Sequence, residues 1–194
     1  MKREVVFVHV PKTGGASVLQ ICLHHRVMVI EHDLRDPNHI SLMQYKRRKP
    51  DIYSFAVVRN PWDRVVSTYF FLMGGGIKEE DREDAERFVS KYSSFNEFVL
   101  EAFNDKAILE QIHFRPQYKW LSDDNKLIVD QVGRFEELQT HCTRWFRSVG
   151  LPNYTLPHVN KSGHDQYRTY YTDDTAAIIR RAYSQDVELF KYTF

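Results

Sequence analysis

The sequence predicts an α/β protein with three layers: a mostly parallel central sheet flanked by helices. Short apolar, β-prone runs alternate along the chain with segments whose apolar residues recur every three to four positions. At two places, after Val10 and after Val58, an apolar run passes into a helical pattern across a very short loop. Ligands of open parallel sheets bind beyond the carboxyl ends of the strands, so these two junctions are the first candidates for a functional site.

The composition predicts one domain and no general attraction to polyanions. The chain has 194 residues, of which 42% are hydrophobic, enough for a single domain over residues 1–194. Lysine and arginine number 27 against 26 acidic residues, a formal net charge of +1. Neither nucleic acid nor an acidic membrane is therefore expected as a partner, and any anion site must be local.

The cysteine count and the hydropathy argue against a disulfide-rich, a metal-binding and a membrane-spanning protein. Cys22 and Cys142 are too few for a disulfide framework or a metal cluster, and no metal is expected. Cys22 falls on the apolar face of the first predicted helix, which favours a buried small hydrophobic side chain. The first strand starts close to Met1 and no later run reaches the length of a membrane span, so a cytoplasmic protein is expected.

The first junction has the composition of an oxyanion site. It follows the strand-like run Glu4–Val10 and reads Pro11-Lys12-Thr13-Gly14-Gly15-Ala16-Ser17. Two glycines let the backbone approach a ligand closely, and the following helix contributes the partial positive charge of its N-terminus. Lys12 adds a charge, and Thr13 and Ser17 add hydroxyls. The loop is not a Walker A loop, because its lysine precedes the glycines, which argues against a nucleotide kinase.

The second junction follows the apolar run Phe55–Val58. Asn60 is a good N-cap and Pro61 suits the first helical position, so a helix is predicted from there to about Met73. Arg59, at the strand end, can offer a planar fork of donors to a phosphate, and Ser67 can add a hydroxyl. An alternative is that Arg59 only pairs with a neighbouring acid.

Together the two junctions resemble a known family. The motif Pro11–Gly15, followed by Arg-Asn-Pro-Trp-Asp-Arg-x-x-Ser over residues 59–67, resembles the sulfotransferases that use 3′-phosphoadenosine 5′-phosphosulfate (PAPS). It is most similar to the carbohydrate branch, with its heparan sulfate 2-O- and chondroitin-type enzymes, and to short bacterial relatives. Further segments follow in the family's order, namely Val132–Leu138, Leu156–Ser162 and Asp186–Tyr192. The resemblance covers nearly the whole chain and implies a P-loop-like fold.

The resemblance implies a donor site for PAPS, with 3′,5′-ADP as the product. The 5′-phosphosulfate would be held by Pro11, Lys12, Thr13, Gly14, Gly15, Ala16 and Ser17. The 3′-phosphate would be held by Arg59 and Ser67, and Lys161 and Ser162 would belong to a late basic loop that covers the nucleotide. Many relatives have threonine at position 16, and Ala16 removes one hydroxyl from the site.

Sulfuryl transfer to a hydroxyl also needs a base. Imidazole, with a pKa near 6.5, suits this task near neutral pH. His39 is the preferred base, since the family has a histidine just before the helix that leads into the Arg-Asn-Pro strand. His32 is the second candidate, with the neighbouring carboxylates Glu31 and Asp33 behind it. Lys12 would be catalytic as well, by neutralising charge on the leaving oxygen.

The acceptor side is less defined. His113, Arg115 and Gln117 lie in a polar-aromatic stretch that could contact a sugar or a phenol, although turn and packing roles explain it equally well. The charged segment 78–87 is predicted to be solvated, or else a lid hinged at the glycines 74–76. The acceptor is expected to carry a hydroxyl, and the family favours a carbohydrate. A P-loop-type kinase or hydrolase and a catalytically silent nucleotide-binding module remain alternatives, and the oligomeric state stays open.

The remaining pattern predicts further elements. They are a strand over 26–30, a helix over 40–49, a helix capped by Ser94 that extends to Phe103, a strand over 126–135, a helix over 136–149 and a terminal helix over 173–192.

Overall fold

The structure is a computed structural model, and it describes residues 4–31, 40–156 and 164–194. By their contacts the residues form two compact units. The sheet unit comprises Met1–Arg59 and Gln117–Asn160, and the helical unit comprises Asn60–Pro116 and Lys161–Phe194. Neither unit is continuous in sequence, because the chain passes from one to the other three times. The prediction of a single domain stays a prediction.

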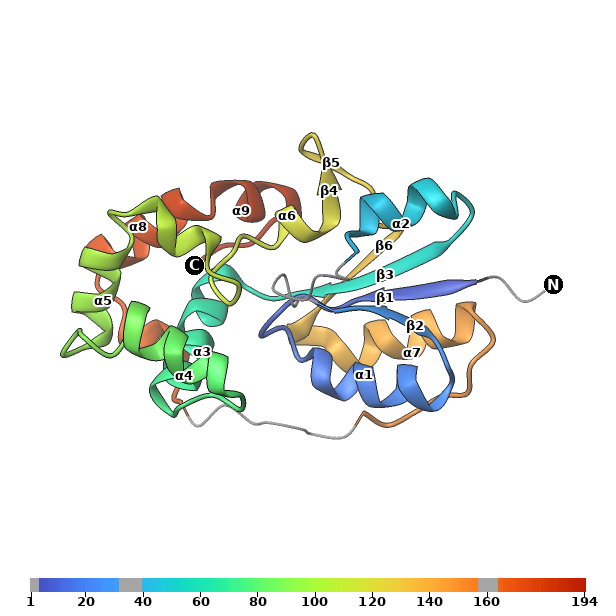
Figure 1. The fold of residues 1–194 in the computed structure, drawn as a ribbon, viewed down its shortest axis with the longest axis horizontal. Helices are drawn as coiled ribbons and strands as arrows, with labels where there is room; N and C mark the ends of the chain where they lie inside the picture. Colours follow the sequence, from blue (N-terminus) through green and yellow to red (C-terminus); the bar gives the residue numbers. More distant parts are fainter. Residues whose placement is uncertain (1–3, 32–39, 157–163) are drawn as a thin grey trace. The chain divides into compact units, whose positions relative to one another are not determined.

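The sheet unit contains a four-stranded parallel sheet, which confirms the predicted fold class. The strands lie in the order β2 (Met28–Ile30), β1 (Val5–Val8), β3 (Tyr53–Val58) and β6 (Gln131–Arg134). Each neighbouring pair is parallel. Figure 1 shows α1 (Gly15–His24) and α7 (Leu138–Ser148) on one face of this sheet and α2 (Leu42–Arg48) on the other. The three layers are therefore helix, sheet and helix.

The core of the sheet unit lies between the sheet and the α1–α7 layer. The rings of Phe55 and Trp145 stack with their centroids 4.4 Å apart. Phe7 joins them, with its ring centroid 6.1 Å from that of Phe55. Cys22 and Cys142 are buried in the same cluster, and burial raises the pKa of both thiols to about 12. Both cysteines behave as small hydrophobic side chains, as predicted for Cys22.

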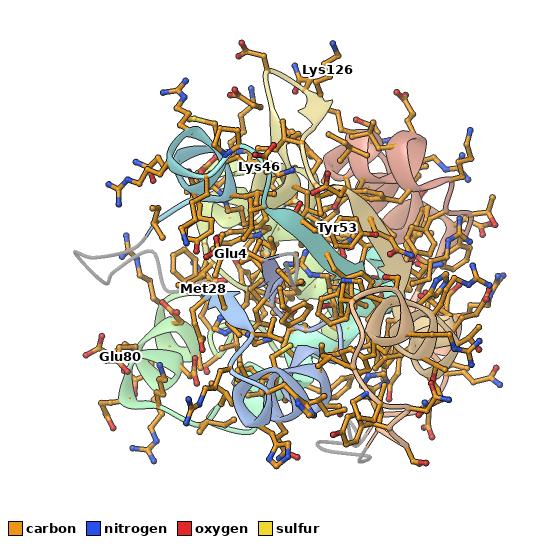
Figure 2. The ribbon with its side chains drawn as sticks, turned by 90° about the vertical axis from the view of Figure 1, so that its right-hand side faces the viewer. Glu4, Met28, Lys46, Tyr53, Glu80 and Lys126 are labelled. Atoms are coloured by element: carbon orange, nitrogen blue, oxygen red, sulfur yellow. The ribbon has the colours of Figure 1, made fainter. Side chains whose placement is uncertain are left out.

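Polar contacts fix the amino-terminal edge of the sheet. One carboxylate oxygen of Asp130 accepts from the Ser54 amide at 2.8 Å, the Ser54 hydroxyl at 2.6 Å and Lys46 Nζ at 2.7 Å. The Tyr53 hydroxyl donates to Gln131 Oε1 at 2.9 Å. Figure 2 looks onto this side of the sheet, where Glu4, Lys46 and Tyr53 are labelled. Asp130 thus joins α2, β3 and the start of β6.

The helical unit is built around α3 (Pro61–Met73), which packs against α4 (Glu79–Phe88) and α8 (Asp173–Ala182). Asn60 Oδ1 accepts from the Trp62 amide at 3.1 Å and Pro61 opens the helix, so the predicted cap is confirmed. The predicted cap of α5 (Phe95–Ala102) is confirmed too, since Ser94 Oγ accepts from the Glu97 amide at 3.2 Å. In the part of the chain described, no helix is long and apolar enough to cross a membrane.

The other elements are short. They are η1 (Lys106–Glu110), α6 (Tyr118–Leu121), β4 (Ser122–Asp123), β5 (Lys126–Leu127), η2 (Phe135–Glu137), η3 (Tyr167–Tyr170) and α9 (Ser184–Phe190).

Two predicted elements are divided in the structure. The strand predicted over 126–135 splits, because β5 turns back on β4 through Asp124 and Asn125, whose φ angles of 45° and 62° form a two-residue hairpin turn. Only β6 joins the main sheet. The terminal helix predicted over 173–192 breaks at Tyr183, where the side chain is buried and the hydroxyl donates to the Phe114 carbonyl at 2.6 Å.

Most residues of the charged segment 78–87 are exposed, as predicted, but the segment is an ordered helix and not an irregular excursion. It forms α4, in which Asp81 and Asp84 are buried. Asp81 Oδ2 accepts from the amides of Ile77 and Lys78 at 2.9 and 3.0 Å and so caps the helix. Asp84 Oδ2 accepts from Gln111 Nε2 at 2.9 Å. Charge count alone missed these acids, because their partners come from the backbone and from a distant segment.

The Asp130 contacts generate a stability prediction. Burial alone would raise the pKa of Asp130, but the hydrogen bonds from Lys46 and Ser54 outweigh burial and lower it. A folded-state pKa below the unfolded value means that the stabilisation is present at neutral pH and is lost as the pH falls through the folded-state pKa. Asp130→Asn should therefore lower the free energy of unfolding by about 1–2 kcal/mol at pH 7, and the difference from wild type should shrink on acidification.

Urea unfolding of wild type and variant at several pH values measures this difference. Asp51→Asn, at an exposed aspartate close to the start of β3, is the matched control and should change stability little. Equal effects of the two substitutions would contradict the role assigned to Asp130.

Candidate functional site

Three neighbouring parallel strands end together at the carboxyl edge of the sheet. Val8 pairs with Ala56, and Val58 pairs with Arg134. The segments that follow these strands therefore lie next to one another: the loop Pro11–Ser17 after β1, Arg59 after β3 and Phe135 after β6. We refer to Pro11–Ser17, which includes the first turn of α1 (Gly15–Ser17), as the 11–17 loop. Most of the donor-site residues predicted from the sequence fall on this edge.

The 11–17 loop has two residues in the left-handed region. The φ angle of Lys12 is +64° and that of Gly14 is +77°. This conformation is cheap for glycine and costs a lysine about 1 kcal/mol or more, so the surrounding structure must hold Lys12 in place. The hydroxyl of Thr13, which is fully buried, donates to the Val10 carbonyl at 2.9 Å. Because that proton is used within the loop, the structure supports a bracing role for Thr13.

The loop leads into the N-terminus of α1. Gly14 is the N-cap residue, and as a glycine it has no side chain to cap this helix end. The first amides of an α-helix have no acceptor within the helix, and the helix dipole adds positive potential where they point. Ser17, which is buried, lies in this first turn. An uncapped helix start after a glycine-rich loop is the arrangement that binds phosphate and sulfate groups.

The two glycines are required by close neighbours. A Cβ on Gly14 would lie 2.8 Å from Phe135 Cδ2 and 3.0 Å from a methyl carbon of Leu138. A Cβ on Gly15 would lie 2.1 Å from His9 Cδ2. The His9 ring thus covers the first turn of α1, and its Nδ1 lies 4.0 Å from Glu31 Oε2.

Arg59 is buried and held at both its main chain and its side chain. Its amide donates to Gln117 Oε1 at 2.8 Å, and its carbonyl accepts from Gln117 Nε2 at 2.9 Å. Its Nη1 donates to the Lys12 carbonyl at 3.2 Å. The guanidinium carbon lies 4.2 Å from the centre of the Phe135 ring. The arginine predicted to bind a phosphate is therefore fixed against the 11–17 loop.

Gln117 has a packing role, one of the two alternatives that the sequence left open for it. Its side chain is fully buried, and its amide group spans the main chain of Arg59. This arrangement favours the packing alternative over contact with an acceptor. The sequence could not reveal the partner, because Gln117 and Arg59 are 58 positions apart.

His113 and Arg115 lie in the helical unit. His113 Nε2 lies 3.5 Å from Asp81 Oδ1, and its Nδ1 lies 3.2 Å from Gln111 Nε2. Burial raises the pKa of Asp81, but the hydrogen bonds from the amides of Lys78 and Ile77 and the charge of His113 outweigh burial. The pKa of Asp81 is therefore lowered. Arg115 Nη1 pairs with Glu110 Oε2 at 2.9 Å. His113 thus belongs to a buried network that attaches α4, and acceptor contact by His113 or Arg115 stays a prediction.

The other predicted residues are not brought into this arrangement. Ser67 is buried in α3 of the helical unit, so its pairing with Arg59 stays a prediction. His32, His39, Lys161 and Ser162 lie outside the described residues. The identity of the base and the role of the late loop therefore stay predictions as well.

Phe135 is a residue of this edge that sequence reasoning did not single out. It appeared only within the family-like segment Val132–Leu138. A usable signal was present, since β6 is the third strand-like run to end at this edge. The strand predicted over 126–135 ended at Phe135, one residue after the end of β6, so its carboxyl end was located although its start was not.

Comparison with known proteins identifies the family. The model of the sulfotransferase family matches residues 2–193. The chain belongs to the sulfotransferase family. An uncharacterized protein of Archaeoglobus fulgidus is 30% identical over 115 residues, which is 59% of this chain and 81% of that protein. Membership of the family supports a sulfotransferase enzyme that acts on a hydroxyl-bearing acceptor.

Two solved sulfotransferase structures are similar at low identity. One is mouse sulfotransferase SULT7A1 complexed with PAP, with 12% identity and a TM-score of 0.46 over 100% of this chain and 90% of that one. The other is a sulfotransferase from Alicyclobacillus acidocaldarius, with 14% identity and a TM-score of 0.44 over 100% of this chain and 98% of that one.

The contact between Gly15 and His9 generates a prediction for the loop. Gly15→Ala should destabilise the protein by about 1–3 kcal/mol, because the new methyl group overlaps the His9 ring. The double variant Gly15→Ala with His9→Ala should be less destabilised than the sum of the two single variants, since the smaller side chain gives room to the methyl group. Thermal and urea unfolding of the four proteins measure the coupling.

Gly74→Ala is the matched control. Gly74 has a φ of −78° and its nearest atom would be 3.3 Å from the new Cβ, so a small effect is expected. Additive effects of the His9 and Gly15 substitutions would show that the ring does not constrain position 15.

Proposed function

We propose that this chain transfers a sulfuryl group from PAPS to an acceptor hydroxyl and releases 3′,5′-ADP. One observation carries the proposal: a glycine-containing loop, an uncapped helix start and a buried arginine meet at one edge of the sheet, with Arg59 Nη1 3.2 Å from the Lys12 carbonyl. PAPS carries an anionic group at each end of its ribose. An edge with two adjacent cationic features suits such a donor.

The residues present fit the 5′-phosphosulfate. The first-turn amides of α1 supply donors, and Lys12 supplies a positive charge at the start of the loop. Gly14 and Gly15 let Phe135, Leu138 and His9 pack closely against the backbone of this turn, because both positions exclude a Cβ. Ala16 lacks the hydroxyl that many relatives have, so amide donors carry more of the binding at this position.

The 3′-phosphate is assigned to Arg59, Ser67, Lys161 and Ser162. Arg59 has the rigid side chain that bidentate phosphate binding requires, since both its main chain and its guanidinium are held. The other three residues are assigned to this role by their positions in the family-like motifs.

The reaction we propose is an in-line displacement at sulfur. A bond forms between the acceptor oxygen and sulfur, and the bond from sulfur to the bridging oxygen of the 5′-phosphate breaks. The acceptor proton passes to His39, with His32 as the second candidate, and Lys12 neutralises the charge that develops on the leaving oxygen. A carbohydrate of the kind used by the related branch is the proposed acceptor.

The donor class is tested first by thermal shift. At 100 times its dissociation constant, a ligand that binds only the folded state stabilises it by about 2.7 kcal/mol. For a chain of this length this corresponds to a rise in Tm of roughly 5–10 °C. We expect such a rise with 3′,5′-ADP and little change with ATP and Mg²⁺. The reverse result would favour a kinase or nucleotide hydrolase and would refute the PAPS assignment.

Catalysis is tested at Lys12. Loss of one positioned donor typically costs on the order of 10²-fold or more in rate, so Lys12→Ala should reduce transfer from radiolabelled PAPS by at least that factor. The acceptor panel comprises glycans and small phenols, and 3′,5′-ADP binding by calorimetry is measured in parallel. Lys126→Ala, at an exposed lysine of the β4–β5 hairpin, is the control and should retain the wild-type rate. A near-normal rate for Lys12→Ala would remove Lys12 from the mechanism, and binding of 3′,5′-ADP without transfer to any acceptor would favour the silent module.

A further inference from the structure

Phe135 contacts both halves of the proposed donor site. It is the first residue of η2, directly after β6, and its side chain is half-buried. Two of its ring carbons would lie 2.8 and 2.9 Å from a Cβ on Gly14, so the ring rests against the backbone of the 11–17 loop. The Arg59 guanidinium lies over the same ring, with its central carbon 4.2 Å from the ring centre.

Arg59 in turn supports the loop. Its Nη1 donates to the carbonyl of Lys12, the residue whose φ of +64° is costly for a lysine. A charged donor on this carbonyl stabilises the left-handed conformation that leads into Gly14. Arg59 therefore has a structural partner in the 11–17 loop, in addition to the 3′-phosphate proposed for it.

We propose that Phe135 is a positioning residue that holds Arg59 against the 11–17 loop, so that this arginine supports both phosphate-binding parts of the site. The proposal rests on the proposed function for the identity of the ligand. Its structural content, that the Phe135 ring orders Arg59 and the loop, can be tested without any ligand.

An aromatic ring suits this role for a physical reason. A guanidinium stacked on a ring uses its flat face for the ring, and all of its N–H groups stay in the plane of the cation, free of that contact. One of them reaches the Lys12 carbonyl at 3.2 Å. An aliphatic side chain could fill the space beside Gly14, as Leu138 does, but it would not orient the cation.

Two devices immobilise Arg59. Gln117 fixes its main chain through two hydrogen bonds, and Phe135 lies against the guanidinium, 4.2 Å from its central carbon to the ring centre. A side chain ordered before binding loses little entropy when the ligand arrives, and such preorganisation raises affinity. Without Phe135 the main chain would stay in place, while the guanidinium would gain rotamers and the Lys12 carbonyl would lose its donor for part of the time.

The test compares wild type with Phe135→Leu, Phe135→Tyr and Arg59→Lys. Calorimetry measures the affinity for 3′,5′-ADP and for adenosine 5′-phosphate, which lacks the 3′-phosphate. Hydrogen exchange of the amides of residues 12–17 is measured without ligand. Phe146→Leu, at a fully buried ring of α7 in the core cluster, is the matched control for loss of packing.

We expect Phe135→Leu to weaken the binding of both nucleotides by roughly 3- to 30-fold, the range that corresponds to a cation–π contact of this kind. The loop amides should exchange faster. Arg59→Lys should have the same two effects, because it keeps the charge and loses the planar stack. Phe135→Tyr keeps the ring and should retain the wild-type affinities and loop exchange. Phe146→Leu should lower Tm and leave both affinities within about 2-fold of those of the wild type.

Three outcomes would overturn the proposal. The first is unchanged loop exchange in both Phe135→Leu and Arg59→Lys. The second is a loss of affinity for 3′,5′-ADP alone, which would make Arg59 a reader of the 3′-phosphate without a role in the loop. The third is failure of Phe135→Tyr to restore binding. If wild type bound neither nucleotide, the proposed function would fail, while the exchange measurements would still decide whether Phe135 orders the loop.

Discussion

The shared end of three parallel strands is the constraint on which the candidate site depends. Parallel pairing in register places the residues after β1, β3 and β6 side by side, whatever their separation in sequence. The buried stack of Phe7, Phe55 and Trp145 holds the sheet against α1 and α7, and Asp130 ties its opposite edge. The 11–17 loop, Arg59 and Phe135 follow these strands closely, so the rigid sheet restricts their positions.

Electrostatics explains why the site is local. With a net charge of +1, the chain has no strong overall field, so an anion must be attracted by groups that converge within a few ångströms. An uncapped helix start and a buried arginine provide this convergence, and burial strengthens both because the surrounding dielectric is low. The strained φ of Lys12 fits the same picture, since unfavourable backbone geometry persists where neighbouring contacts enforce it.

Features that depend on residues close together in the chain could be predicted from the sequence. Strand-to-helix junctions, the Asn60 and Ser94 caps and the glycine-rich loop each depend on residues a few positions apart, and the structure has them where they were predicted. The division of 126–135 and the burial of Asp84 in α4 were missed, because a tight hairpin and the partner of Asp84 follow from contacts outside any local window. For the same reason the sequence could not decide between packing and acceptor contact for Gln117, whose partner Arg59 is distant in the chain.

The buried position of Gln117 argues against direct contact between this residue and an acceptor. A fully buried amide that spans the Arg59 main chain positions this arginine, and it has no surface to offer to an acceptor. His113 is similarly occupied by Asp81 and Gln111, where it anchors α4. A polar-aromatic stretch that looks like a sugar-binding surface in sequence thus supplies internal supports at these two positions. Gln117 can therefore influence an acceptor only through the residues it positions, whereas acceptor contact by His113 or Arg115 stays a prediction.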